Sequence, residues 1–134
     1  MSEFSYSRTI RFHETDGAGV VYFANVLVLC HEAYEASLAF VGIDLQRFFD
    51  GQGLAYPIVH ASIDFRRPLR CGQEVLIDLA PHQQQESHFE VQYHLTHDAR
   101  TVGSALTRHV CIDAQRQRSP LPPEILGWIQ RLRA

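Results

Sequence analysis

The feature that most restricts the fold is a change in the spacing of apolar residues along the chain. Between about residues 24 and 41, apolar side chains recur at helical spacing, which predicts one helix of about 16 residues with an apolar stripe. Asn25 is a candidate N-cap of this helix, and Gly42 is a suitable stop just past its last apolar residues. Most of the remaining chain has the alternating pattern of strands.

Strand character is found in one segment before the helix and in four after it. The first segment alternates apolar and polar residues from Phe4 to Phe12. The later segments are residues 57–65, 74–80, 89–96 and 101–113, and the motif PLPPE predicts a final helix with a proline in its first turn. The run QQQ, residues 83–85, is expected in a turn.

Short connections between the later strands predict antiparallel pairing. The fold class is therefore expected to be α+β, with an antiparallel five-stranded sheet against one long helix. A single sheet of this size has open edges, so we expect two copies to dimerise by extending the sheet.

Composition excludes several classes of function. The chain has 134 residues, which suggests a single domain spanning 1–134, and its hydrophobic content of 46% is enough for a core. A net charge of −3 argues against nucleic acid as a partner, and no apolar run approaches the ~20 residues of a membrane span. All 12 basic residues are arginine, which excludes a lysine Schiff base. Three widely spaced cysteines and the lack of a signal-peptide pattern indicate a cytoplasmic protein.

The segment HETDGAGVVYFAN, residues 13–25, places a carboxylate, a glycine turn and a helix start close together. The first N–H groups of a helix lack intrahelical partners, so those near Phe23 can stabilise an oxyanion. The carboxylate of Asp16 can act as a nucleophile or as a general base. This combination suits hydrolysis of an activated acyl group. The simpler interpretation is that Asp16 only caps a turn shaped by the glycines.

The string DGAGVVYFAN, from Asp16 to Asn25, resembles the signature of the 4-hydroxybenzoyl-CoA thioesterase family, and the resemblance covers nearly the whole chain. It implies a hot-dog fold and a homodimer or homotetramer with active sites between protomers. The family's catalytic aspartate corresponds to Asp16, its oxyanion-binding backbone N–H corresponds to Phe23, and Gly19 keeps the turn open. The family's tyrosine after Ala-Asn is Val26 here, so no role is transferred to that position.

Three longer strings, FANVLVLCHEAYEASL, PIVHASIDF and ALTRHVCI, are similar to a cyanobacterial branch of this family. Its members hydrolyse 1,4-dihydroxy-2-naphthoyl-CoA in phylloquinone (vitamin K1) synthesis. The resemblance therefore implies an acyl-CoA substrate and no cofactor. The alternatives are a thioesterase for another aryl or short acyl group, a non-catalytic acyl-CoA-binding module, and a dehydratase that uses His31 and Glu35.

Several side chains are candidates for substrate binding. Tyr22 and Phe23, together with Tyr56, can provide flat apolar walls for an aromatic acyl group. His60 lies within an apolar strand, where it is either a core or interface histidine or a donor to a hydroxyl of the acyl group. A local basic patch can hold the phosphates of coenzyme A or be a solvated turn; it comprises Arg66, Arg67 and Arg70.

Other carboxylates and histidines are weaker candidates for the chemistry. Glu32, in the predicted helix, is the second choice for the catalytic carboxylate. Glu14 is either paired with Asp16 or solvated, and His13 is expected to pack at the end of the first strand. Cys30 is adjacent to a histidine on the helix, so the two point apart and form no catalytic pair. The eight histidines show no compact ligand cluster, so no metal site is expected.

Overall fold

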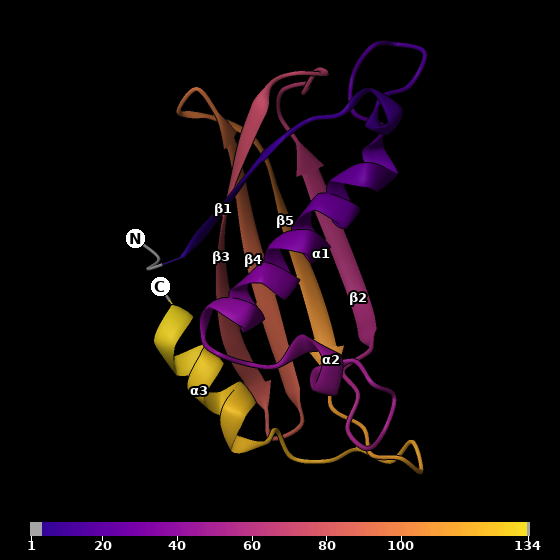
Figure 1. Cartoon of the computed structure of the whole chain (residues 1–134), viewed down its shortest axis with the longest axis vertical. Helices are drawn as coiled ribbons and strands as arrows, with labels where there is room; N and C mark the ends of the chain where they lie inside the picture. The colour runs from indigo at the N-terminus through magenta and orange to yellow at the C-terminus, as the bar shows by residue number, and fades with distance from the viewer. Residues whose placement is uncertain (1–3, 134) are drawn as a thin grey trace.

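The computed structural model describes residues 4–133 and contains one antiparallel sheet of five strands. Helix α1 (Phe23–Phe40) crosses one face of this sheet, as Figure 1 shows. The strands have the spatial order β1-β3-β4-β5-β2, and they are β1 (Ser5–Thr9), β2 (Ile58–Phe65), β3 (Glu74–Gln85), β4 (His88–His97) and β5 (Arg100–Val110). The short helix α2 (Leu45–Phe48) follows α1, and α3 (Pro123–Leu132) packs against β3. The predicted α+β class, antiparallel pairing and long helix are confirmed.

The long helix begins earlier than its sequence pattern predicts. Tyr22 is the N-cap, with φ −63° and ψ 135°, so the expectation that Asn25 caps the helix is wrong. Asn25 lies within the first turn, where its side-chain Nδ2 donates to the carbonyl oxygen of Glu14 at 3.0 Å. The asparagine thus attaches the preceding segment to the helix. The predicted stop is confirmed, because α1 ends at Phe40 and Gly42 follows with φ +91°.

Three strand boundaries also differ from the expected ones. The first strand ends at Thr9, because the chain then tightens into a 3₁₀ turn, Phe12–Glu14. The QQQ run is not in a turn: Gln83 and Gln85 pair with β4, and the turn follows at 86–87. The last strand ends at Val110, because Ile112 leaves the ladder with β4 and bridges to other segments.

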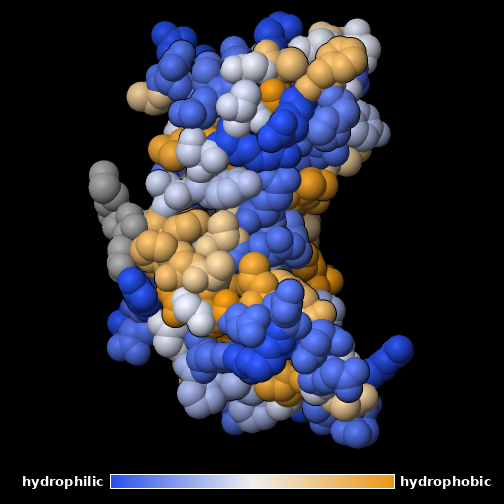
Figure 2. All heavy atoms as spheres, viewed as in Figure 1, coloured by the Kyte–Doolittle hydropathy of each residue, from blue (hydrophilic) through white to orange (hydrophobic). Residues whose placement is uncertain are grey.

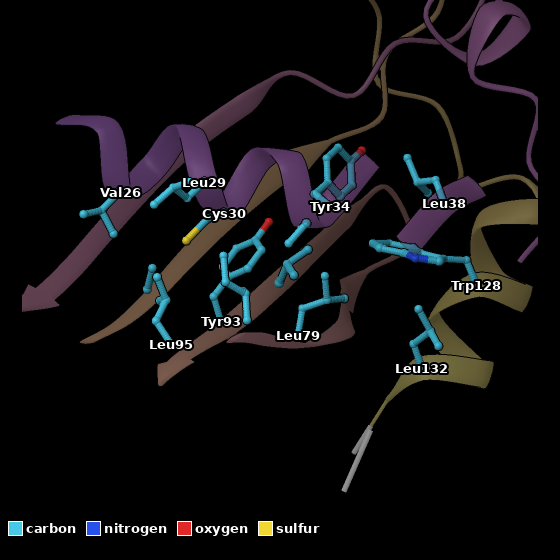
Figure 3. Close-up of a cluster of buried hydrophobic side chains, with 14 of the residues drawn as sticks. Val26, Leu29, Cys30, Tyr34, Leu38, Leu79, Tyr93, Leu95, Trp128 and Leu132 are labelled. Carbon is cyan, nitrogen blue, oxygen red and sulfur yellow. The ribbon is translucent and has the colours of Figure 1, made fainter. Parts of the chain in front are cut away.

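The core lies between α1 and the helix-facing side of the sheet, with α3 closing one end (Figure 3). Leu29, Cys30 and Leu38 of α1 are completely buried. At the α3 end, the indole Nε1 of Trp128 donates to the Ser37 hydroxyl at 3.0 Å, which links the two helices. Burial raises the pKa of the Cys30 thiol to about 12. Cys30 therefore stays protonated and is no nucleophile.

One buried histidine connects the core to the segment that precedes β2. His109 is 1% exposed, its Nδ1 lies 3.1 Å from the Tyr56 carbonyl oxygen, and its Nε2 lies 2.9 Å from the Thr107 hydroxyl. A carbonyl only accepts, so Nδ1 carries the proton and Nε2 accepts from the hydroxyl. Desolvation, with a smaller contribution from His31, lowers the pKa of His109 to about 4. The ring is therefore neutral at pH 7.

This neutral histidine makes stability depend on pH. In the unfolded chain a histidine has a pKa near 6.5, so the unfolded state gains a proton as pH falls while folded His109 does not until about pH 4. Stability is therefore lost between these two values. Between pH 7 and pH 5, urea unfolding should show the wild type losing about 2 kcal/mol more than the variant His109→Gln. An equal loss in both proteins would contradict a neutral His109.

Strand β2 forms an exposed edge of the sheet. Its residues are exposed on both faces along nearly the whole strand, including Ile58, Val59 and Phe65, the last two at 56% each. Figure 2 shows hydrophobic surface along the side of the molecule where Figure 1 places this strand. An apolar edge with unpaired backbone groups favours pairing with another strand.

Candidate active site

The turn that follows the 3₁₀ segment is closed by its own backbone. The N–H of Asp16 donates to the carbonyl of Val20 at 3.0 Å, and the N–H of Gly19 donates to the carbonyl of Asp16 at 2.9 Å. Gly19 has φ +78°, a conformation that glycine adopts without strain. Asp16 is exposed, and its Oδ1 accepts from the N–H of Ala18 at 2.9 Å. Asp16 does cap the turn, and this leaves Oδ2 without a partner among residues 4–133.

The start of α1 is held beside this turn by one oxygen. The Glu14 carbonyl accepts from the N–H of Tyr22 at 2.9 Å and from the side chain of Asn25. The helix has no side-chain cap. Within the described part of the chain, the N–H groups of Phe23 and Ala24 have no acceptor. The helix therefore presents two free donors, and the positive end of its dipole, where an anion can bind.

Both rival carboxylates of this region are engaged by Arg8. Glu14 is buried, at 4% exposed, and is bound by the Arg8 guanidinium and by the N–H of Arg11 at 2.8 Å. Arg8 holds the pKa of Glu14 below its usual value. The carboxylate of Glu32 also binds this guanidinium, with its Oε1 2.6 Å from Arg8 Nε. The same oxygen accepts from the Tyr6 hydroxyl at 2.9 Å.

The two interpretations of Glu14 as a partner of Asp16 or as a solvated residue are therefore wrong. The 3₁₀ turn directs Glu14 inward, whereas an extended segment would have placed it on the same face as Asp16. His13 is exposed rather than packed at a strand end. Asp16 is thus the carboxylate of the motif that remains accessible.

A largely apolar hollow of about 310 Å³ adjoins the helix start. Its walls come from the first turns of α1, from the segment after β2 and from the neighbouring ends of β4 and β5. The lining residues are Val20, Val21, Phe23, Val26, Phe65, Arg66, Arg67, Pro68, Leu69, Leu95, Val102 and Gly103. We call this space the acyl hollow, because its size and its mainly apolar walls suit a small aromatic group.

Gly103 allows two walls of the acyl hollow to meet. A Cβ at this position would lie 2.8 Å from the Asp64 carbonyl oxygen, closer than side chains and backbone approach. The adjacent Val102 carbonyl accepts from the N–H groups of Arg66 at 2.9 Å and Arg67 at 3.2 Å. Strand β5 thereby fixes the segment after β2. Sequence reasoning missed Gly103, and its only signal was a glycine inside a strand of larger residues.

The structure brings together some of the predicted substrate-binding residues. Phe23, Arg66 and Arg67 line the acyl hollow. Tyr22 does not line it, but its ring lies 4.8 Å from that of Phe23, and both rings are exposed. Arg70 Nη1 lies 3.5 Å from the Gly19 carbonyl, beside the Asp16 turn.

Other predicted residues lie elsewhere. Tyr56 stacks on Phe48 of α2, with ring centroids 4.8 Å apart, so it is no wall of the acyl hollow. His60 is exposed on the edge strand β2, where strand alternation puts it on the face opposite Ile63, which packs against the core. In one protomer His60 therefore points away from the helix side of the sheet. On α1, His31 Nδ1 lies 3.5 Å from a Glu35 carboxylate oxygen, but neither residue lines the acyl hollow.

Over residues 4–133 there is no group of three or more side chains suited to hold a metal ion. No helix in the same range is long and apolar enough to cross a membrane.

The sequence profile of the thioesterase-like superfamily matches residues 10–129. The chain belongs to this superfamily. The match extends from just after β1 into α3 and so includes the Asp16 turn and every wall of the acyl hollow. The hot-dog fold expected from the sequence is thereby confirmed.

Relatives within the thioesterase-like superfamily resemble the chain over nearly its whole length. A 1,4-dihydroxy-2-naphthoyl-CoA hydrolase of Nostoc punctiforme is 52% identical over 95% of this chain and 86% of its own. The protein of that name from Synechococcus elongatus is 47% identical over 97% of both chains. The crystal structure of a 1,4-dihydroxy-2-naphthoyl-CoA thioesterase from Synechocystis superposes with a TM-score of 0.90, at 39% identity and 95% coverage of both chains.

Proposed function

We propose that this protein hydrolyses 1,4-dihydroxy-2-naphthoyl-CoA to 1,4-dihydroxy-2-naphthoate and CoA, a step of phylloquinone synthesis in the cytoplasm. The observation that carries the proposal is the identity of about half to hydrolases named for this substrate, over nearly the full chain. The acyl hollow supports it, because an apolar space beside two free backbone donors suits an aromatic thioester. The whole chain, 1–134, would act as one thioesterase domain.

In this proposal the Phe23 N–H donates to the thioester oxygen and Asp16 provides the carboxylate. Asp16 either attacks the carbonyl carbon, giving a mixed anhydride that water then cleaves, or removes a proton from the attacking water. Both routes expel the CoA thiolate, a good leaving group that needs no strong general acid. The negative charge on the carbonyl oxygen is met by the helix start, where one such donor contributes roughly 3 kcal/mol to the transition state.

We further propose that two copies pair along β2, giving a homodimer or a homotetramer built from such dimers. The apolar, doubly exposed edge strand supports this assembly. Phe65 is both a residue of this edge and a wall of the acyl hollow, so a second copy at β2 would lie next to the site.

A substrate panel tests the proposed function. Thiol release should be followed with 1,4-dihydroxy-2-naphthoyl-CoA, benzoyl-CoA and a short aliphatic acyl-CoA. We expect the naphthoyl thioester to have the largest kcat/KM, by about tenfold or more, because the apolar walls bury more of the larger ring system. A preference for another acyl group would keep the thioesterase and change its substrate. Binding without release on any of the three would favour an acyl-CoA-binding module instead.

A further inference from the structure

The segment that carries the proposed catalytic carboxylate buries almost no apolar side chain. It lies between two buried residues, Ile10 and Val21, and of residues 11–20, all within the described part of the chain, only Glu14 is buried. Phe12, the aromatic residue of this stretch, is 81% exposed. Buried positions are usually apolar, so this segment is attached in an unusual way, by a carboxylate.

The Glu14 carboxylate is bound through both of its oxygens. Oε1 accepts from Arg8 Nη1 at 2.7 Å and from the N–H of Arg11 at 2.8 Å, and Oε2 accepts from Arg8 Nη2. Arg8 is a residue of β1, where it pairs with Val75 of β3, so its backbone is part of the sheet. The same guanidinium binds Glu32 of α1, which lies beside β1 in Figure 1. One arginine therefore attaches the segment both to the sheet and to the long helix.

This ion pair orients the segment more than it stabilises the fold. The side chains of Arg8 and Glu14 are 14% and 6% exposed, so both charges are largely removed from water. The cost of removing two charges from water offsets most of their attraction, and an apolar pair of similar volume would stabilise a fold as well. A planar guanidinium with two parallel hydrogen bonds, however, fixes the orientation of a carboxylate as well as its distance. Arg8 therefore sets the position of Glu14 more narrowly than an apolar contact would.

The backbone of Glu14 extends this fixed position to both reacting groups. On one side, its carbonyl accepts from the N–H of Tyr22 at 2.9 Å, and Tyr22 directly precedes Phe23 and its free N–H. On the other side, Asp16 follows two residues later, in a turn closed by the bond from its N–H to the Val20 carbonyl at 3.0 Å. A shift of Glu14 would therefore move the carboxylate and the helix start relative to each other.

We propose that Arg8 and Glu14 are positioning residues for thioester hydrolysis, and that their ion pair sets the spacing between the Asp16 carboxylate and the Phe23 N–H. The proposal rests on the function proposed above, in which those two groups act on the same carbonyl. Neither Arg8 nor Glu14 lines the acyl hollow, so they act through the turn and the helix start rather than on the substrate. A displacement of about 1 Å between reacting groups can lower a rate by about 10²-fold, so a small movement of the turn is enough.

The test is the kinetic effect of Glu14→Gln on the best substrate of the panel. Glutamine has the same size and still accepts from the N–H of Arg11, but its NH₂ group replaces Oε2 and faces Arg8 Nη2, donor against donor. We expect kcat to fall about 30-fold while KM stays within about twofold of the wild-type value. Arg8→Lys keeps the positive charge but loses the two parallel hydrogen bonds, and it should lower kcat about tenfold. The double variant should be about as slow as the slower single variant, because both substitutions break the same contact.

The matched control is Glu90→Gln, which breaks another largely buried ion pair. The side chain of Glu90 is 12% exposed, and its Oε2 accepts from Arg108 Nε at 2.8 Å. Glu90 lies on β4 and does not line the acyl hollow. All variants are assayed at a temperature at which circular dichroism shows them folded, and their urea midpoints are compared. Glu90→Gln should lower the urea midpoint about as much as Glu14→Gln and keep wild-type kcat, which separates positioning from a loss of stability.

Wild-type kcat in Glu14→Gln would overturn the proposal, and so would an equal loss of kcat in Glu14→Gln and Glu90→Gln. If the wild type cleaves no thioester, the function proposed above fails, and amide hydrogen exchange then decides whether the ion pair holds the segment. Exchange of the Tyr22 N–H that is about tenfold or more faster in Glu14→Gln, but not in Glu90→Gln, would support this role of the ion pair. Unchanged exchange in Glu14→Gln would overturn it.

Discussion

Asp16→Asn is expected to lower kcat by about 10²-fold or more while leaving the free energy of unfolding nearly unchanged. Asparagine retains a side-chain oxygen that accepts from the N–H of Ala18, so the turn keeps its internal hydrogen bond. The substitution removes the negative charge and the second carboxylate oxygen. Both the nucleophilic and the general-base route depend on that ionised group, so either would be lost.

The measurement is thiol release from the best substrate of the panel, together with urea unfolding of the same protein. Glu35→Gln is a suitable control, because it neutralises another exposed carboxylate, on α1, that does not line the acyl hollow. It should keep wild-type kcat. Turnover that persists in Asp16→Asn would move the chemistry to another group. Glu32 would be examined next, although its ion pair with Arg8 argues against it.

The second large effect is expected from Phe23→Pro, which deletes the backbone N–H at the start of α1. Removal of one oxyanion donor lowers kcat by about 10²–10³-fold in other enzymes. The backbone accepts this change, because proline is favoured at the first position of a helix. Tyr22, the residue before it, has a ψ of 135°, which lies in the range that a following proline permits.

The variant Phe23→Ala distinguishes the contribution of the backbone N–H from that of the phenyl ring. This variant keeps the N–H but removes one wall of the acyl hollow, so it should raise KM more than it lowers kcat. If the proline and alanine variants have the same kcat, the Phe23 N–H does not bind the oxyanion. Far-ultraviolet circular dichroism of the proline variant is the control that checks whether the helix still forms.

Local patterns predicted the elements well and their ends less well. The apolar stripe of α1 and the glycine after it are properties of neighbouring residues, so the helix and its stop are readable from sequence. Asn25 has the side chain of a good N-cap, but this side chain donates to the backbone carbonyl of Glu14, eleven positions earlier. The QQQ run is polar like a turn, yet cross-strand pairing with β4 keeps it in β3. In both cases a tertiary contact outweighs the local preference.

The candidate site likewise has one part that follows from neighbouring residues and one that depends on tertiary contacts. The Asp16 turn and the free helix start lie within ten residues of each other, so one motif predicted both. The acyl hollow is assembled from distant segments. Gly103 has no local signal that would join it to residues 66–69. In one protomer His60 and Tyr56 lie away from the acyl hollow, because chemical suitability says nothing about which face or end of the sheet a residue occupies.

The backbone carbonyl of Glu14 accepts hydrogen bonds from both the Tyr22 N–H and the Asn25 side chain. This shared acceptor limits how the sequence of the protein can change. It makes residues 14–25 a closed loop of fixed length, which tolerates neither insertion nor deletion without displacing both the carboxylate and the helix start. The opposite wall, residues 65–69, is attached to β5 through the Val102 carbonyl and to this loop through the N–H of Val21, which donates to the Leu69 carbonyl at 2.8 Å. Under the function proposed above, exchange of side chains at 65–68 should therefore alter acyl preference while the reacting groups stay in place, whereas a shift of the Leu69 backbone would displace the loop as well.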